Sequence, residues 1–181
     1  MNFDCKRIIW ACFAVFFAAT GPIAAQQATQ SANAPASASL VGPESNLPLP
    51  RFVSLKTAEA NVRRGPSLTH RIDWVFQRRN MPMQVIAEYG HWRRVVDRDG
   101  QGGWIHFRLL SGNRTVIIDD ALLPLRSRAS EDSAIVAQLE AGVVASLGEC
   151  SQSWCRLTAG GYRGWATKAV LWGVDDDELR D

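Results

Sequence analysis

Two short stretches, NVRRGPS at 61–67 and GQGGWI at 100–105, return later in the chain as PLRSRAS at 124–130 and GYRGWA at 161–166. Between them, YGHWRRV at 89–95 aligns with SQSWCRL at 151–157. The separation from the arginine to the first tryptophan agrees between the copies within one position, and so does the separation between the two tryptophans. Such agreement at three anchors predicts a tandem repeat of one small domain.

Each copy has the pattern of short strands joined by turns. Apolar runs at 81–88 and 143–147 are each bounded by a glycine, and strands at 92–96 and 154–158 follow them. Asp99-Gly100 and Gly160-Gly161 are typical hairpin turns, because their backbones tolerate a positive φ. The sequence predicts an all-β protein with domains at 51–114 and 115–173 and an acidic tail at 174–181.

A family resemblance rests on Asn61–Ser67, Gly90-His91-Trp92, Asp99-Gly100 and Gly103-Trp104-Ile105. These motifs resemble the bacterial SH3-like domain, and 52–174 as a whole resembles its two-copy proteobacterial version. The second copy departs from the pattern, with Pro124 for the asparagine and Arg128-Ala129 for Gly-Pro. The resemblance implies two tandem SH3-like small β-barrels, each five-stranded and strongly bent, with a long loop after the first strand.

Residues 1–25 are typical of a secretory signal peptide. Lys6 and Arg7 precede a short apolar stretch, and small residues end at Ala25, where we expect cleavage. An uncleaved anchor and a lipoprotein acylated at Cys12 are the alternatives. Residues 26–50, rich in Ala, Ser, Gln and Pro, predict a disordered linker. The expected location is the periplasm or the exterior, with no stable membrane span after cleavage.

Export leaves Cys150 and Cys155 as the cysteines of the mature chain. In an oxidising compartment two such residues usually form a disulfide, although two buried thiols are an alternative. Aligned with an offset of 62, Glu88 and Arg93 occupy their places in the first copy. This alignment predicts that a cross-strand ion pair replaces the disulfide there.

Neither copy shows a recognisable catalytic arrangement. The two cysteines have no histidine within 40 positions to act as a base, and His70, His91 and His106 lack the spacing of a zinc site. We therefore expect no enzyme activity, no metal and no cofactor, and export argues against a nucleic-acid partner.

Charge separates the two copies. Residues 51–114 hold twelve Lys and Arg against five Asp and Glu, and residues 115–181 hold six against eleven. Either the basic and acidic domains attract each other, or the basic domain docks on a polyanion. The resemblance implies binding of cell-wall peptidoglycan or an envelope protein; a periplasmic adaptor that binds a peptide is the alternative function.

Strand alternation suggests a binding face on the first domain. Cys155 and Leu157 form the apolar face of 154–158, so the same parity points Val95 inward and Trp92 and Arg94 outward. By the resemblance, Trp92 is a ligand-groove tryptophan, although it could instead cover the junction between the copies. The remaining candidate residues are Arg63, Arg64, Tyr89, His91 and Trp104, of which Trp104 either lines the groove or packs in the core.

Overall fold

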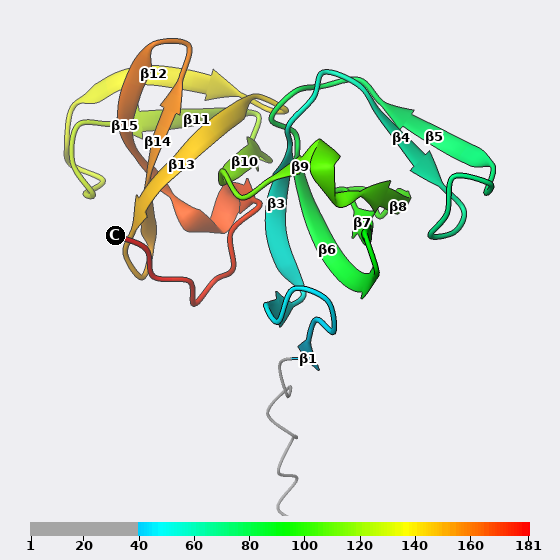
Figure 1. The fold of residues 1–181 in the computed structure, drawn as a ribbon. Helices are drawn as coiled ribbons and strands as arrows, with labels where there is room; N and C mark the ends of the chain where they lie inside the picture. The colour runs from blue at the N-terminus through cyan, green and yellow to red at the C-terminus, as the bar shows by residue number, and fades with distance from the viewer. Residues whose placement is uncertain (1–39) are drawn as a thin grey trace, which may run out of the picture. The chain divides into compact units, whose positions relative to one another are not determined.

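The computed structural model describes residues 40–181 (Figure 1). The predicted signal peptide, its cleavage site and the linker up to residue 39 lie outside the described residues. The strands of the first domain are β3 (Arg51–Leu55), β4 (Ala60–Arg63), β5 (Ile72–Phe76), β6 (Pro82–Tyr89), β7 (Trp92–Val96), β8 (Gly102–His106) and β9 (Leu110–Ser111). Those of the second are β10 (Thr115–Ile118), β11 (Leu122–Arg126), β12 (Ile135–Glu140), β13 (Val144–Cys150), β14 (Trp154–Ala159), β15 (Tyr162–Thr167) and β16 (Leu171–Trp172). One 3₁₀ turn per domain, η1 (Phe107–Leu109) and η2 (Lys168–Val170), precedes its last strand.

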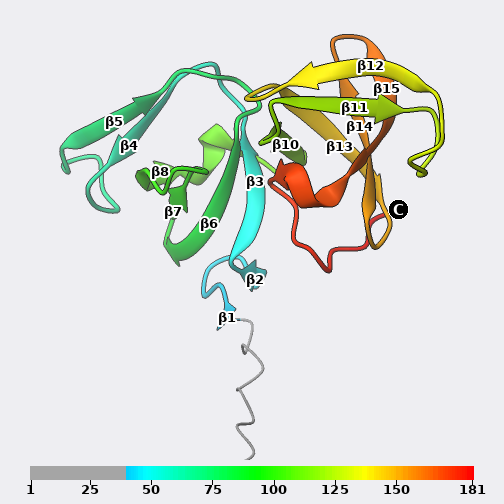
Figure 2. The same ribbon diagram turned by 180° about the vertical axis from the view of Figure 1, so that it is seen from behind.

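The two domains repeat one sheet topology. The first sheet has the order β5-β4-β8-β7-β6-β3-β9 and the second the order β12-β11-β15-β14-β13-β10-β16, which is the same order strand for strand (Figures 1 and 2). The predicted all-β fold with two tandem SH3-like domains is confirmed. The expectation of five strands is wrong in detail. The loop after the first strand is itself the hairpin β4–β5, and a two-residue strand, β9, is the seventh strand of a sheet that does not close.

Glycines sit where the predicted turns need them. Gly100 has a φ of 77°, and Gly160 and Gly161 have φ values of 57° and 86°. Consecutive positive values match the two-residue turn between β14 and β15, whose right-handed twist follows that of the strands. The hairpins predicted at these positions are present.

A second glycine requirement explains the Gly-Trp pairs. A Cβ on Gly103 would lie 2.7 Å from the backbone oxygen of Arg63, and one on Gly164 would lie 2.6 Å from that of Arg126. A neighbouring strand therefore passes too close for any side chain. The same close approach sets Arg63 opposite Trp104, the residue that follows Gly103.

Each domain has its own apolar core. The fully buried apolar side chains of the first domain include Leu55, Val62, Met83, Val85, Val95 and Ile105, and those of the second include Val116, Ile118, Leu125, Cys155 and Leu157. These residues alternate with outward-facing neighbours along their strands, as expected for a sheet with one buried face.

Residues 40–49, which we call the N-terminal strap, are ordered on the first domain. They form the hairpin of β1 (Leu40–Val41) and β2 (Pro48–Leu49), and Leu49 joins the first core. The prediction of a disordered linker is therefore wrong for residues 40–50. The prediction from composition failed because it counts apolar residues and does not account for hydrogen bonds made by backbone and polar side-chain groups.

The strap is held by the buried carboxylate of Glu88, whose side chain has no exposed surface. That carboxylate accepts hydrogen bonds from the backbone N–H groups of Glu44 and Ser45, at 3.1 and 2.9 Å, and from the Ser45 hydroxyl at 2.6 Å. Arg51 and Arg93 pair with it at 2.7 and 3.2 Å. The predicted Glu88–Arg93 ion pair is thus confirmed, and it is buried.

Several contacts join the two domains. The Phe52 and Trp172 rings meet edge to face, with centroids 5.3 Å apart. Two ion pairs cross from the basic to the acidic stretch, Arg98–Asp119 at 2.9 Å and Arg114–Glu178 at 2.8 Å. Part of the excess of basic residues in the first domain and of acidic residues in the second is therefore explained by ion pairs between the two domains.

Candidate ligand-binding site

Strands β4, β8 and β7 carry a row of outward-facing side chains in the first domain. Arg63 stands opposite Trp104, and Trp104 stands opposite Arg94. One step along the same face, Trp92 stands opposite His106. Val95 and Ile105, between these positions, are fully buried. The predicted parity, with Val95 inward and Trp92 and Arg94 outward, is confirmed.

The row borders an open cavity of about 380 Å³, which we call the basic cavity. Its lining residues are Arg63, Arg64, Asp73, Arg94, Val96, Gly100, Gly102, Gly103 and Trp104. Four of the seven residues proposed from the sequence thus surround one cavity, and Trp104 forms part of its wall rather than lying in the core. The sequence did not identify Asp73 as part of this site.

The arginines of the basic cavity have different roles. The Arg63 Nη1 atom donates to the carbonyls of Leu68 and His70, at 3.0 and 2.6 Å, so this side chain fixes the loop between β4 and β5. The Arg64 Nε atom donates to Asp73 at 2.9 Å. Hydrogen bonds from Arg64 and then Arg71 hold the pKa of Asp73 below its ordinary value.

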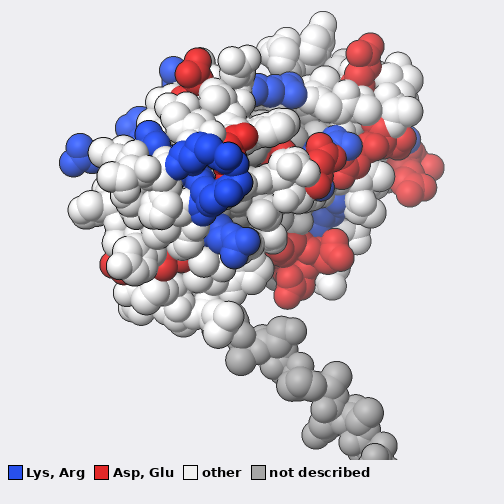
Figure 3. Space-filling model, turned by 90° about the vertical axis from the view of Figure 1, so that its right-hand side faces the viewer, with Lys and Arg blue, Asp and Glu red and all other residues white. Residues whose placement is uncertain are grey.

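Arg94 differs from Arg63 and Arg64 because its guanidinium is not engaged by another group of the described residues. Its side chain is exposed, and it forms no ion pair or side-chain hydrogen bond with any of residues 40–181. Viewed from the side on which β4, β5, β7 and β8 lie in Figure 1, basic side chains gather in a contiguous group (Figure 3). An unpaired guanidinium beside an indole ring suits a ligand that has both a carboxylate and an apolar face.

A cluster of rings extends the face beyond the basic cavity. We call His91, Trp92, His106 and Phe107 the aromatic cluster. The Trp92 ring meets the His106 ring edge to face at 5.5 Å, and His106 stacks on Phe107 at 5.1 Å. His91 lies 5.8 Å from His106, and Tyr89, opposite Trp92, is 64% exposed.

The sequence predicts Tyr89, His91 and Trp92 as site residues, but not His106 or Phe107. Strand alternation could have found His106, two residues after Trp104 on the same face. The Trp92 ring meets the His106 ring of its own domain.

The aromatic cluster holds a histidine with a shifted pKa. Burial, followed by the charges of Arg108 and His91, lowers the pKa of His106. Its Nδ1 atom accepts a hydrogen bond from the backbone N–H of Arg108 at 3.3 Å, which requires an unprotonated nitrogen.

We expect His106 to titrate below its ordinary value of 6.5 in an NMR titration of the folded protein. Because the lowered pKa makes the folded state bind a proton at His106 less readily than the unfolded state does, this residue should make the fold less stable as the pH falls through 6.5. Arg108→Ala should raise the His106 pKa, and Arg128→Ala, in the other domain, should leave it unchanged. A midpoint at or above 6.5 in the parent protein would contradict the expectation.

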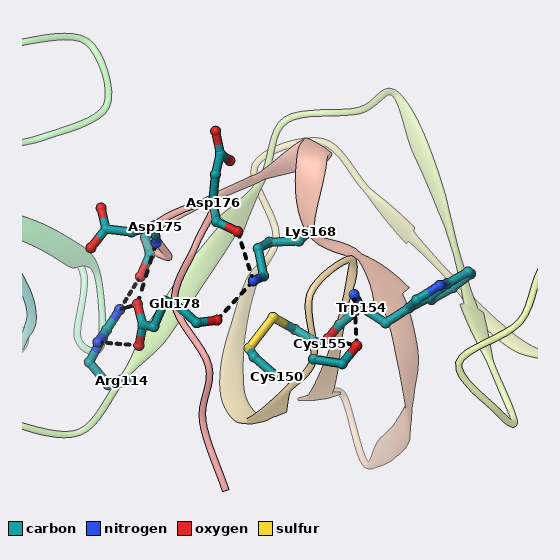
Figure 4. Close-up of a disulfide and its surroundings, with 10 residues drawn as sticks. Arg114, Cys150, Trp154, Cys155, Lys168, Asp175, Asp176 and Glu178 are labelled. Atoms are coloured by element: carbon teal, nitrogen blue, oxygen red, sulfur yellow. Dashed lines mark hydrogen bonds and ion pairs between the residues drawn. A yellow bond between two sulfur atoms is a disulfide. The ribbon is translucent and has the colours of Figure 1, made fainter. Parts of the chain in front are cut away.

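The second domain has a disulfide at the corner where the first has Glu88 and Arg93. Cys150 and Cys155 are bonded with an S–S distance of 2.06 Å, which confirms the predicted pair. The acidic tail crosses this corner (Figure 4): Cys150 and Arg180 exchange two backbone hydrogen bonds, of 2.8 and 3.0 Å. The buried Lys168 ammonium donates to the carbonyls of Asp176 and Glu178, so the tail is part of the folded domain.

Residues 40–181 contain neither a metal-binding cluster nor a membrane-spanning helix. No group of three or more His, Cys, Asp and Glu side chains in this part of the chain is arranged to hold a metal ion. No helix within it is long and apolar enough to cross a membrane.

The chain contains two small antiparallel β-domains in tandem, and both have the same strand order. The family model for the bacterial SH3 domain matches residues 56–112 and 119–173. The chain therefore belongs to the bacterial SH3 domain family, whose members are binding domains.

Comparison with solved structures finds NlpC2 and NlpC1 from Trichomonas vaginalis, each 14% identical to this chain with a TM-score of 0.32. The matches cover 68% and 72% of this chain, which spans 48% of each of those proteins. Similarity this distant carries no conclusion about function. No curated protein matches the sequence.

Proposed function

We propose that this chain is an exported, non-catalytic binding protein whose first domain recognises cell-wall peptidoglycan through the basic cavity. The observation that carries the proposal is Arg94, an exposed guanidinium without a partner among residues 40–181, next to the Trp104 ring. Peptidoglycan offers carboxylates on its stem peptides and sugar faces that stack on aromatic rings.

The non-catalytic part of the proposal is supported by the state of the cysteines. The thiolate is the reactive form of cysteine, and Cys150 and Cys155 are joined in a disulfide. The basic cavity contributes arginines, a tryptophan and one ion-paired carboxylate, a set suited to holding an anion.

Binding should depend on Arg94. We expect Arg94→Ala to lower the affinity for purified, protein-free peptidoglycan about tenfold, because a hydrogen bond to a charged group is worth roughly 1.5–3 kcal/mol. A co-sedimentation assay at low salt measures the bound fraction. Arg163→Ala is the matched control, since it removes an exposed arginine from β15 of the second domain.

Equal retention of the parent, Arg94→Ala and Arg163→Ala would remove the basic cavity from consideration. If the folded parent is not retained on peptidoglycan but binds an envelope protein through an extended peptide, the second candidate function, a periplasmic adaptor, takes its place. The exposed Tyr89 and Phe107 rings favour that candidate, because rings at a sheet surface also bind peptides.

Export rests on residues 1–25 of the sequence. We expect N-terminal sequencing of the protein recovered from the cell envelope or the medium to begin at or near Gln26. Recovery of the full-length chain in the membrane fraction would instead support an uncleaved anchor.

A further inference from the structure

The second domain repeats the Arg-Trp-Arg row of the first. Arg126 stands opposite Trp165, and Trp165 stands opposite Arg156, as Arg63, Trp104 and Arg94 do on β4, β8 and β7. The first arginine has the same role in both, because the Arg126 Nη1 atom donates to the carbonyl of Ser133 in the loop between β11 and β12, at 2.8 Å. The backbone framework of a second site is therefore present.

The two rows differ in what faces the last arginine. Arg156 Nη1 lies 3.1 Å from Glu149 Oε1, on the neighbouring strand β13. In the first domain the residue aligned with Glu149 is Ala87, which stands directly opposite Arg94. An alanine leaves the guanidinium of Arg94 available, whereas a glutamate occupies that of Arg156.

A second difference between the two copies also makes the second site less positively charged. Arg64, which lines the basic cavity, immediately follows Arg63; the residue that follows Arg126 is Ser127, which has no charge. The second site thus has one cation fewer than the first. Its carboxylate, Glu149, lies beside Arg156, whereas the carboxylate of the first site, Asp73, pairs with Arg64 and leaves Arg94 free of a partner among residues 40–181.

We propose that Glu149 is a specificity-determining residue that weakens anion binding at the second domain, so that an anion binds preferentially at the first. An incoming anion must displace a carboxylate that is tethered beside Arg156 at high effective concentration, and it also meets the repulsion of that carboxylate. The proposal goes beyond the proposed function and rests on it only in taking Arg94 as the contact for an anion.

The exposure of the Arg156 and Glu149 side chains sets how strongly Glu149 can weaken anion binding. The side chains of Arg156 and Glu149 are 34% and 48% exposed, so solvent screens their interaction. Removing the Glu149 charge should therefore strengthen anion binding at the second domain by roughly fivefold rather than by orders of magnitude.

The test is an NMR titration of the full-length, ¹⁵N-labelled chain with inorganic phosphate at low ionic strength. In the parent, the Trp104 indole and Arg94 Nε–H signals should shift first, and those of Trp165 and Arg156 should shift only at roughly fivefold higher phosphate. In Glu149→Gln the second pair should shift at lower phosphate than in the parent, with binding roughly fivefold tighter than at the parent's second domain. Ala87→Glu should weaken the response of the first domain by a similar factor.

Two results would overturn the inference: equal phosphate affinity at both domains of the parent, or no gain in Glu149→Gln. Should Ala87→Glu fail to fold, Glu149→Gln still decides, because it replaces an exposed side chain with one of equal size. Failure of the proposed function looks different: the phosphate shifts follow the expected pattern, while the parent is not retained on peptidoglycan.

Discussion

Glu88→Ala should lower the free energy of unfolding by about 3–5 kcal/mol, the range for removing one partner of a buried ion pair. The substitution leaves Arg51 and Arg93, whose side chains are 17% and 11% exposed, without the carboxylate between them. It also leaves the strap N–H groups of Glu44 and Ser45 without their acceptor. Chemical denaturation measures the loss, and faster amide exchange at those two residues would show that the strap has been released.

The pH dependence of stability provides a second measurement on Glu88. Burial alone would raise its pKa, but hydrogen bonds from Ser45 and then Arg51 lower the pKa to about 2, against an ordinary value of 4.5. The folded state therefore binds this proton less readily than the unfolded state. The resulting stability, about 3 kcal/mol at neutral pH, is lost as the pH falls from about 5 toward 2.

Glu59→Ala is the matched control for Glu88→Ala, because Glu59 is an exposed carboxylate of the same domain. It should change the stability by less than about 0.5 kcal/mol. A Glu88→Ala protein as stable as this control, with an unchanged acid transition, would show that the buried carboxylate does not hold the strap.

The parts of the fold that depend on local sequence were predictable. Glycines with positive φ place the turns, and alternation assigns the faces of β7 and β14. The Glu88–Arg93 pair was predictable because the second copy revealed, through its cysteines, which two positions face each other.

A departure of the second copy from the family pattern also has a local explanation. A Cβ on Gly65 would lie 2.5 Å from the His70 ring. Arg128 and Ser133 occupy the aligned positions in the second copy. The smaller serine, whose hydroxyl donates to the Arg128 carbonyl at 2.9 Å, removes the requirement for glycine.

Contacts between segments distant in the sequence could not be predicted. Glu44 and Ser45 bind the carboxylate of Glu88, which belongs to a strand much further along the chain, and no periodic pattern marks either end of that interaction. Asp73 is near Arg64 in the sequence, but no periodic pattern shows that the β4–β5 hairpin brings the two side chains together in the basic cavity. The alignment sets Glu149 against Ala87, but only the structure shows that Glu149 pairs with Arg156.

Reduction of the Cys150–Cys155 disulfide should lower the free energy of unfolding by about 2 kcal/mol, the chain-entropy value for so short a closed loop. Both cysteines are buried, and Cys155 has no exposed surface, so the reduced thiols should stay packed and add little strain. The tail should loosen with them, because Arg180 is bonded to the backbone of Cys150.

The control for this prediction is the double variant Cys150→Ala, Cys155→Ala, whose stability should not change on addition of a reductant. Denaturation of parent and variant, each with and without dithiothreitol, separates loss of the cross-link from other effects of the reductant. The reduced parent should unfold near the denaturant midpoint of the double variant, and both should come well before the oxidised parent. If reduction leaves the midpoint of the parent unchanged while thiol titration finds two free thiols, the backbone bonds of the tail, and not the disulfide, stabilise this corner.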